Sequence, residues 1–211
     1  MREKDGVVRP DMIHLLMEAR KGRLKYEKPE SSSLDTGFAT VQESEIGTTQ
    51  NYAIEITDEV ITAQALVFFI AGFTTASSTM SFMAYELAVN PDIQKKLQQE
   101  VDVVVSTNDQ ISYEDVLKMK YLDQVVSETL RKYPPGYVMN RICVKDYVIE
   151  PKGDNENVAV IEKGCLVAIP VIGLHYSREF FDDPEKFQPE RFSEENKSKI
   201  IPGSYMPFGM G

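Results

Sequence analysis

Two oppositely charged residues, Glu128 and Arg131, are the pair in this sequence best placed to act together. They lie three positions apart in the stretch ETLR, so their side chains are neighbours on a helix. The apolar residues of this stretch fall on roughly the opposite face, so periodicity alone favours a solvated ion pair worth about 0.2–0.5 kcal/mol. A second layer of protein over this face would instead bury the pair. Arg191, in the stretch PERF, could then bridge Glu128 and nearby backbone through its planar guanidinium.

A second candidate is the stretch AGFTTASS, from Ala71 to Ser78. Gly72 costs a helix about 1 kcal/mol relative to alanine, so the helix is weakened there. The hydroxyl of Thr75 can bond to the carbonyl of Ala71 four residues earlier, which bends the helix and opens a groove beside a flat ligand. Close helix packing through small residues explains the same stretch and is favoured when the stretch is considered alone.

The third candidate is the glycine-rich stretch YMPFGMG at residues 205–211. Gly209 and Gly211 follow Pro207 and Phe208, and glycines in such positions allow a positive φ or a close approach of the backbone to a ligand. We expect a loop that approaches a bound group closely.

Several familiar active-site motifs are absent from the sequence. It contains no glycine-rich phosphate loop, GxSxG or HExxH, which argues against nucleotide-dependent enzymes, serine hydrolases and zinc proteases. His14 and His175 are far apart, and the two cysteines, Cys143 and Cys165, form no CxxC motif and have no metal-ligand neighbours in sequence. Because side chains alone do not form a complete active site, we expect a cofactor to supply the chemistry.

Composition narrows the class of protein further. The 211 residues are 42% hydrophobic, which is typical of a globular chain, and carry a formal net charge of −10. Acidic residues gather in 27–59, and we predict a mobile acidic loop over residues 27–55. No basic patch interleaves with aromatic residues, so we expect no nucleic-acid binding.

The elements that must position these candidates are mainly helical. Caps and apolar spacing predict helices over residues 11–20, 57 to 88 or 89, 90 to about 105, a short one after 112, and 121–133. The helix that begins near 57 would be about 45 Å long, at about 1.5 Å per residue. Its apolar run, Ala65–Phe73, falls below the roughly 18–20 residues that cross a bilayer, so we predict a buried helix segment rather than a membrane span.

After Gly136 the pattern changes to short β-rich runs, VMNRICVKDYVI, NVAVI and LVAIPVIGL, separated by Gly, Pro and Asp. Helices come first, then strands, then loops. The predicted fold class is therefore mainly α with a small β region (α+β).

Five stretches occur in a specific order along the chain: AGFTT, ETLRKYPP, MNRICVKDY, IPVIGLHYSREFFDDPEKFQPERF and PFGMG. Together they resemble the C-terminal half of a cytochrome P-450, a haem-thiolate monooxygenase, and most resemble animal microsomal members, particularly those of insects. Only residues 27–55 fall outside the match. The resemblance implies a partial cytochrome P-450 domain over residues 1–211, with the long central helix over the haem site.

The resemblance gives the long helix a role beside haem. It implies that Ala71 and Gly72 lie near the oxygen site and that Thr75 matches the threonine that steers protons to bound oxygen. Thr74 stands where the family usually has Asp or Glu. A hydroxyl can pass a proton along a chain of waters but cannot hold a stable charge near neutral pH, so the acid half of the relay is altered.

The resemblance also implies a buried structural network. Glu128 and Arg131 match the family's Glu-x-x-Arg, and Arg191 matches the arginine that joins them in supporting the haem pocket. Arg141 resembles the arginine that pairs with a haem propionate.

The last stretch resembles the start of the haem-binding loop, Phe-x-x-Gly-x-Arg-x-Cys, with Phe208 and Gly211 at its first two fixed positions and Pro207 and Gly209 beside them. In the family, the cysteine thiolate of this loop pushes electron density onto iron and favours O–O cleavage. That axial cysteine would lie four positions past Gly211. We therefore expect no metal ligand within these residues, and neither cysteine of the chain matches the ligand position.

The activity implied is insertion of one atom of O₂ into a small apolar substrate, with electrons from an NADPH-dependent reductase, at the cytosolic face of the endoplasmic reticulum membrane. We expect the N-terminal half and its membrane anchor to be missing from this sequence, and the fragment alone to be inactive. A non-catalytic α+β binding or scaffold protein, or the remnant of a truncated gene, would explain the same residues.

Overall fold

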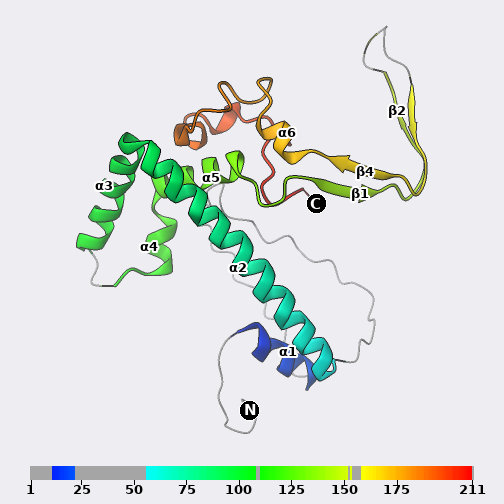
Figure 1. Ribbon diagram of the computed structural model, residues 1–211, viewed down its shortest axis with the longest axis horizontal. Helices are drawn as coiled ribbons and strands as arrows, with labels where there is room; N and C mark the ends of the chain where they lie inside the picture. Colours follow the sequence, from blue (N-terminus) through cyan, green and yellow to red (C-terminus); the bar gives the residue numbers. More distant parts are fainter. Residues whose placement is uncertain (1–10, 22–55, 108–109, 152, 154–157, 211) are drawn as a thin grey trace. The chain divides into compact units, whose positions relative to one another are not determined.

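The computed structural model describes residues 11–21, 56–107, 110–151, 153 and 158–210 (Figure 1). The acidic loop predicted over residues 27–55 lies outside them. The chain divides into two compact units: Met1–Asp35 with Gln42–Ser78, and Thr36–Val41 with Thr79–Gly211.

In the first unit, helix α1 (Met12–Arg20) confirms the helix predicted over residues 11–20. Asp11 caps it, because its carboxylate accepts a hydrogen bond from the backbone N–H of His14 at 3.0 Å. At the other end, Arg20 donates to the carboxylate of Asp58.

Helix α2 (Asp58–Val89) runs for 32 residues, within one residue of the predicted bounds. It begins where Thr57 Oγ1 accepts from the backbone N–H of Val60 at 3.4 Å, and the Thr57 hydroxyl also lowers the pKa of Glu59. It ends before Asn90, whose side-chain amide donates to the carbonyl of Glu86 at 2.8 Å. Both ends were therefore set by residues that sequence reasoning can recognise.

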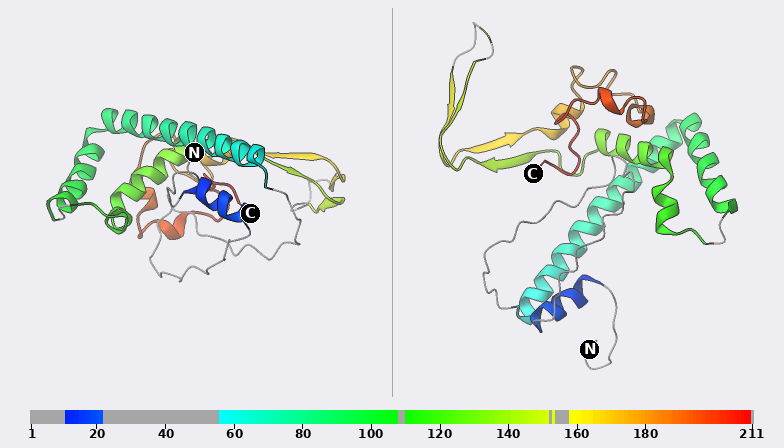
Figure 2. Two further views of the ribbon diagram at one scale, coloured as in Figure 1. Left: turned by 90° about the horizontal axis from the view of Figure 1, so that it is seen from below. Right: turned by 180° about the vertical axis from the view of Figure 1, so that it is seen from behind.

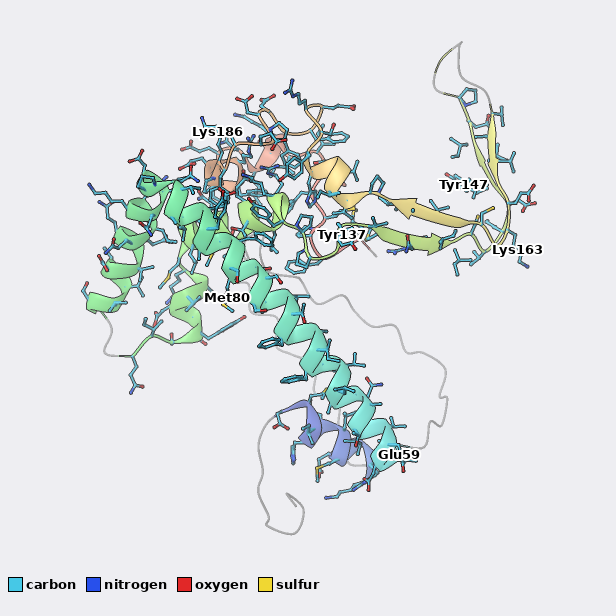
Figure 3. The ribbon with its side chains drawn as sticks, in the orientation of Figure 1. Glu59, Met80, Tyr137, Tyr147, Lys163 and Lys186 are labelled. Atoms are coloured by element: carbon cyan, nitrogen blue, oxygen red, sulfur yellow. The ribbon has the colours of Figure 1, made fainter. Side chains whose placement is uncertain are left out.

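The prediction that the run Ala65–Phe73 is buried is wrong. Side chains project outward along α2 between the labelled Glu59 and Met80 (Figure 3), and Phe69 and Phe73 are 68% and 67% exposed. By length and composition alone, α2 is also the one helix in the described ranges that could cross a membrane. The central helix of a soluble protein, buried in its core, has the same length and composition.

The described residues of the second unit include helices α3 (Pro91–Thr107), α4 (Tyr113–Leu117) and α5 (Lys120–Lys132). A small core joins α3 to α5, and its buried residues are Leu97, Tyr121, Val125 and Phe187. Helix α5 lacks a capping side chain of its own at Met119. Instead, the carboxylate of Glu100 on α3 accepts the backbone N–H groups of Tyr121 and Leu122, each at 2.9 Å. This contact ties α3 to the start of α5 and satisfies two of its unpaired donors.

In the described residues, four short strands form two antiparallel ribbons (Figures 1 and 2): β1 (Met139–Ile142) pairs with β4 (Leu166–Ile169), and β2 (Tyr147–Ile149) pairs with β3 (Ala159–Ile161). Met139 lies opposite Ile169, and Tyr147 lies opposite Ile161. The predicted fold class, mainly α with a small β region, is confirmed.

One β-rich run is only half strand. The stretch predicted from LVAIPVIGL ends as strand β4 at Ile169, and Val171–His175 is helix α6. Pro170 separates the two, because it has no N–H for the ladder and its fixed φ suits the start of a helix. Short 3₁₀ turns follow at Pro189–Phe192 (η1) and Lys197–Lys199 (η2).

Candidate functional site

The Glu128–Arg131 pair is fully buried, so the solvated pair favoured by periodicity alone is wrong. Both side chains are 0% exposed. Arg131 donates to Glu128 twice, from Nε at 2.7 Å and from Nη2 at 2.9 Å, in a bidentate contact. A buried ion pair is costly unless its remaining hydrogen-bonding groups are also satisfied.

Loops far along the chain satisfy those groups. Arg131 Nη1 donates to the carbonyl of His175 at 2.8 Å, and Nη2 donates to the carbonyl of Pro184 at 2.7 Å. Glu128 Oε1 also accepts the backbone N–H of Gln188 at 2.9 Å. The covering layer is thus the segment from α6 to η1, which holds the charged pair through its backbone.

Arg191 reaches the same carboxylate. Its Nε lies 3.4 Å from Glu128 Oε1, and its Nη2 donates to the carbonyl of Asp183 at 2.9 Å. The side chain is 12% exposed, so Arg191 lies at the rim of the cluster and closes it. The structure thus brings Glu128, Arg131 and Arg191 together.

His175 is a member of this cluster that sequence reasoning did not single out. It is 0% exposed, and its ring lies between two backbone groups: Nδ1 is 3.0 Å from the carbonyl of Arg131, and Nε2 is 3.0 Å from the backbone N of Met206. Burial lowers the pKa of His175 to about 4, and the nearby Arg131 cation acts in the same direction. The imidazole is therefore neutral at physiological pH.

The segment after Met206 is a tight turn. The backbone N–H of Gly209 donates to the carbonyl of Met206 at 3.1 Å, with Pro207 at the second position and Gly209 at the fourth. Gly209 has a φ of +86°, and a Cβ there would lie 2.8 Å from the sulfur of Met139 on β1. The positive φ favours glycine at this position, and the flexible side chain of Met139 would have to shift to admit a Cβ. Phe208, at the tip, is 57% exposed.

Arg141 lies beside this turn. Its Nη2 donates to the carbonyl of Met210 at 2.6 Å, and its Nη1 donates to the carbonyl of Asn140 at 3.1 Å. In the described part of the chain the guanidinium has no carboxylate partner, and it is exposed. Strand β1 and the turn therefore present an unbalanced positive charge next to an exposed aromatic ring.

The candidate residues on α2, Ala71 to Ser78, belong to the first unit. Thr75 Oγ1 donates to the carbonyl of Ala71 at 2.6 Å, as predicted. The carbonyl of Thr74 accepts from Ser77 Oγ at 3.2 Å. A Cβ at Gly72 would meet nothing within 4 Å among the described residues, so the packing explanation for this stretch gains no support there.

A second buried carboxylate, also missed from the sequence, joins α2 to α5. Glu86 is 3% exposed, and its Oε1 accepts from Lys132 Nζ at 2.7 Å and from the hydroxyl of Tyr133 at 2.6 Å. Burial and the Glu86 contact raise the pKa of Tyr133, whose ring stacks on Phe82 at 4.2 Å between centroids. These contacts hold the end of α2 against α5. The one sign of them in the sequence is that Glu86 interrupts the apolar residues of α2.

Comparison with known proteins identifies the family of the chain. The family model for cytochrome P450 matches residues 7–211. Cytochrome P450 9e2 of Blattella germanica is 44% identical over the whole chain, and the probable cytochrome P450 9f2 of Drosophila melanogaster is 40% identical over the whole chain. Cytochrome P450 3A31 of Mesocricetus auratus is 46% identical over 74% of the chain.

The match is to one part of these relatives. The chain spans 36% of the length of the Blattella protein, 37% of the Drosophila protein and 30% of the Mesocricetus protein. The five sequence stretches, the cluster around Glu128 and the turn beside Arg141 all lie within the residues that the family model matches. This chain belongs to the cytochrome P450 family.

Proposed function

We propose that this chain is part of a haem-dependent monooxygenase that inserts one atom of O₂ into a small apolar organic substrate, using electrons from an NADPH-dependent reductase. Family membership supports the class of reaction. The observation that carries the proposal is the convergence of β1, α6 and the Met206–Gly209 turn on one another beside the buried cluster of Glu128 and Arg131.

The residues around the turn fit haem, a flat apolar ring with two carboxylates. Arg141 offers a guanidinium without a carboxylate partner in the described residues, which suits a propionate. Pro207, Phe208 and Gly209 offer an apolar turn whose glycine permits close approach. Haem held by a cysteine thiolate supplies the oxygen chemistry, because the thiolate favours O–O cleavage.

The chain's own residues would prepare the site in two ways. The cluster of Glu128, Arg131 and Arg191 would hold the loops beside the turn in a fixed position, since its contacts are charge-assisted and the Glu128–Arg131 pair is fully buried. On α2, Thr75 would pass protons toward oxygen near Ala71 and Gly72, while Thr74 offers a hydroxyl rather than a carboxylate.

Substrate and location are further parts of the proposal. Phe69 and Phe73 stack on the exposed side of α2 with ring centroids 6.1 Å apart, and they would form an apolar wall for the substrate. We assign the protein to the cytosolic face of the endoplasmic reticulum membrane, with attachment through a segment N-terminal to these residues.

The decisive experiment is to sequence the transcript on both sides of the region that encodes Met1–Gly211. We expect an arginine two positions and a cysteine four positions past Gly211. The complete product, reduced under carbon monoxide, should then give the Soret band of a thiolate-ligated haem, and replacing that cysteine with serine should abolish the band. A stop codon after Gly211, or another residue at the cysteine position, would refute the proposal in favour of a binding or scaffold protein.

A further inference from the structure

We propose that His175 is a positioning residue that fixes the first residue of the haem-binding turn through a neutral imidazole. This inference rests on the proposed function for the role of the turn, although the contacts themselves do not. His175 lies between the carbonyl of Arg131, at the end of α5, and the backbone N–H of Met206, where the turn begins.

The two contacts allow one protonation state of the ring. A carbonyl oxygen can only accept a hydrogen bond, so Nδ1 must carry a hydrogen and donate to Arg131 O. A backbone N–H can only donate, so Nε2 must be unprotonated and accept from Met206. The neutral Nδ1–H tautomer satisfies both groups, whereas an imidazolium would face the Met206 N–H with a second hydrogen.

The charges around the ring favour the same state. Arg131 Nη1 donates to the carbonyl of His175 itself, so a guanidinium lies close to the imidazole. Phe181 packs edge-on against the ring at 6.4 Å, and Tyr205 stacks on it at 5.5 Å between centroids. A buried ring with apolar neighbours and a nearby cation is poorly placed to take up a proton.

The contact to Met206 acts on the whole turn. The N–H of Met206 donates to His175, and the carbonyl of Met206 accepts the N–H of Gly209. Both backbone groups of Met206 are therefore held, which fixes the path of Pro207 and Phe208 between them. Tyr205, one residue earlier, donates from its hydroxyl to the carbonyl of Ser127 at 3.1 Å. Two side chains thus anchor the entrance of the turn to α5, and His175 supplies the anchor nearest the turn.

Two near-isosteric variants separate the two contacts. His175→Asn places an amide N–H at the δ position, where it can still donate to Arg131 O, but leaves nothing to accept from Met206. His175→Gln extends an amide oxygen to the ε position, where it can accept from Met206. Leu97→Ala is the matched control, because it weakens the core without touching the turn.

The measurement is amide hydrogen exchange of the complete, haem-free gene product, read at Met206, at Gly209 and along α5. In His175→Asn we expect exchange at Met206 to rise about tenfold with α5 much less affected, and in His175→Gln we expect it to return toward the wild-type rate. Leu97→Ala should raise exchange in α5 and the turn together.

The inference is overturned if His175→Asn exchanges like the wild type at Met206, if His175→Gln gives no rescue, or if the increase spreads evenly through α5. Because this readout needs no haem, it is separate from the proposed function. A wild-type protein that lacks the thiolate spectrum would refute that function and leave the exchange result to decide the role of His175.

Discussion

The neutral state of His175 should make the protein lose stability in mild acid. An unfolded histidine has a pKa near 6.5, whereas burial lowers the pKa of His175 to about 4. Between these values the unfolded chain binds a proton that the folded chain does not. The free energy of unfolding therefore falls as the pH drops through this window, and the contribution is fully present above pH 6.5.

The size of this loss follows from the same two values. Each pH unit in the window is worth about 1.4 kcal/mol, so the full effect is about 3 kcal/mol for one histidine. That is a large share of the stability of an ordinary domain, which is about 5–15 kcal/mol.

Urea unfolding of the complete product at a series of pH values from 7.5 to about 4 would measure the effect. Carboxylates also titrate in acid, so the informative quantity is the difference between the wild type and His175→Gln, which cannot take up this proton. We expect the wild type to lose about 3 kcal/mol more than the variant across the range. Parallel curves for the two proteins would refute the assignment of a neutral, buried imidazole.

Three further substitutions test other parts of the structure. Glu128→Gln leaves the Arg131 cation buried without its carboxylate and should lower the free energy of unfolding by about 3–5 kcal/mol in urea titrations, whereas a loss below 1 kcal/mol would mean that the pair is solvated. Gly209→Ala should lower the melting temperature through a cost of about 1–2 kcal/mol, since φ is +86° and the sulfur of Met139 would have to move; an unchanged melting temperature would contradict this geometry. Glu100→Gln should cost about 0.5–1 kcal/mol because a charge leaves the start of α5, and the difference should shrink in high salt if the helix dipole is responsible.

Local signals in the sequence predicted the helices well. Thr57 at one end and the Asn90–Pro91 pair at the other defined α2 to within one residue, because caps and proline act on their immediate neighbours. The same reasoning misassigned Val171–His175 as strand. A short apolar run fits a strand or a buried helix equally well, and Pro170 was the one local sign of the change.

Burial was much harder to predict than secondary structure. Periodicity compares residues of one helix with each other, so it placed Glu128 and Arg131 on the polar face of α5. What buries them is a segment some 44 to 63 residues further along the chain, which offers backbone carbonyls and N–H groups that no side-chain pattern reveals. The run Ala65–Phe73 on α2 was misjudged in the opposite direction for the same reason, since burial depends on residues outside the helix and the described residues leave this run largely exposed.

The position of His175 could not be predicted from residue type at all. A single histidine after a strand has many possible surroundings, and its partners here are two main-chain groups. By contrast, the turn at Pro207–Gly209 was recognisable because glycine and proline report directly on backbone conformation.

The backbone contacts of Arg131 have a consequence for how this region forms. An isolated α5 can pair Arg131 with Glu128, but the carbonyls of His175 and Pro184 reach the guanidinium only when the later loops are already in place. A chain in which those loops have not yet docked therefore carries a poorly satisfied charge pair on α5, and water must remain around it. The region from α5 to η1 should thus fold as one cooperative unit, because the loops that dock last are the ones that satisfy the buried charges of α5.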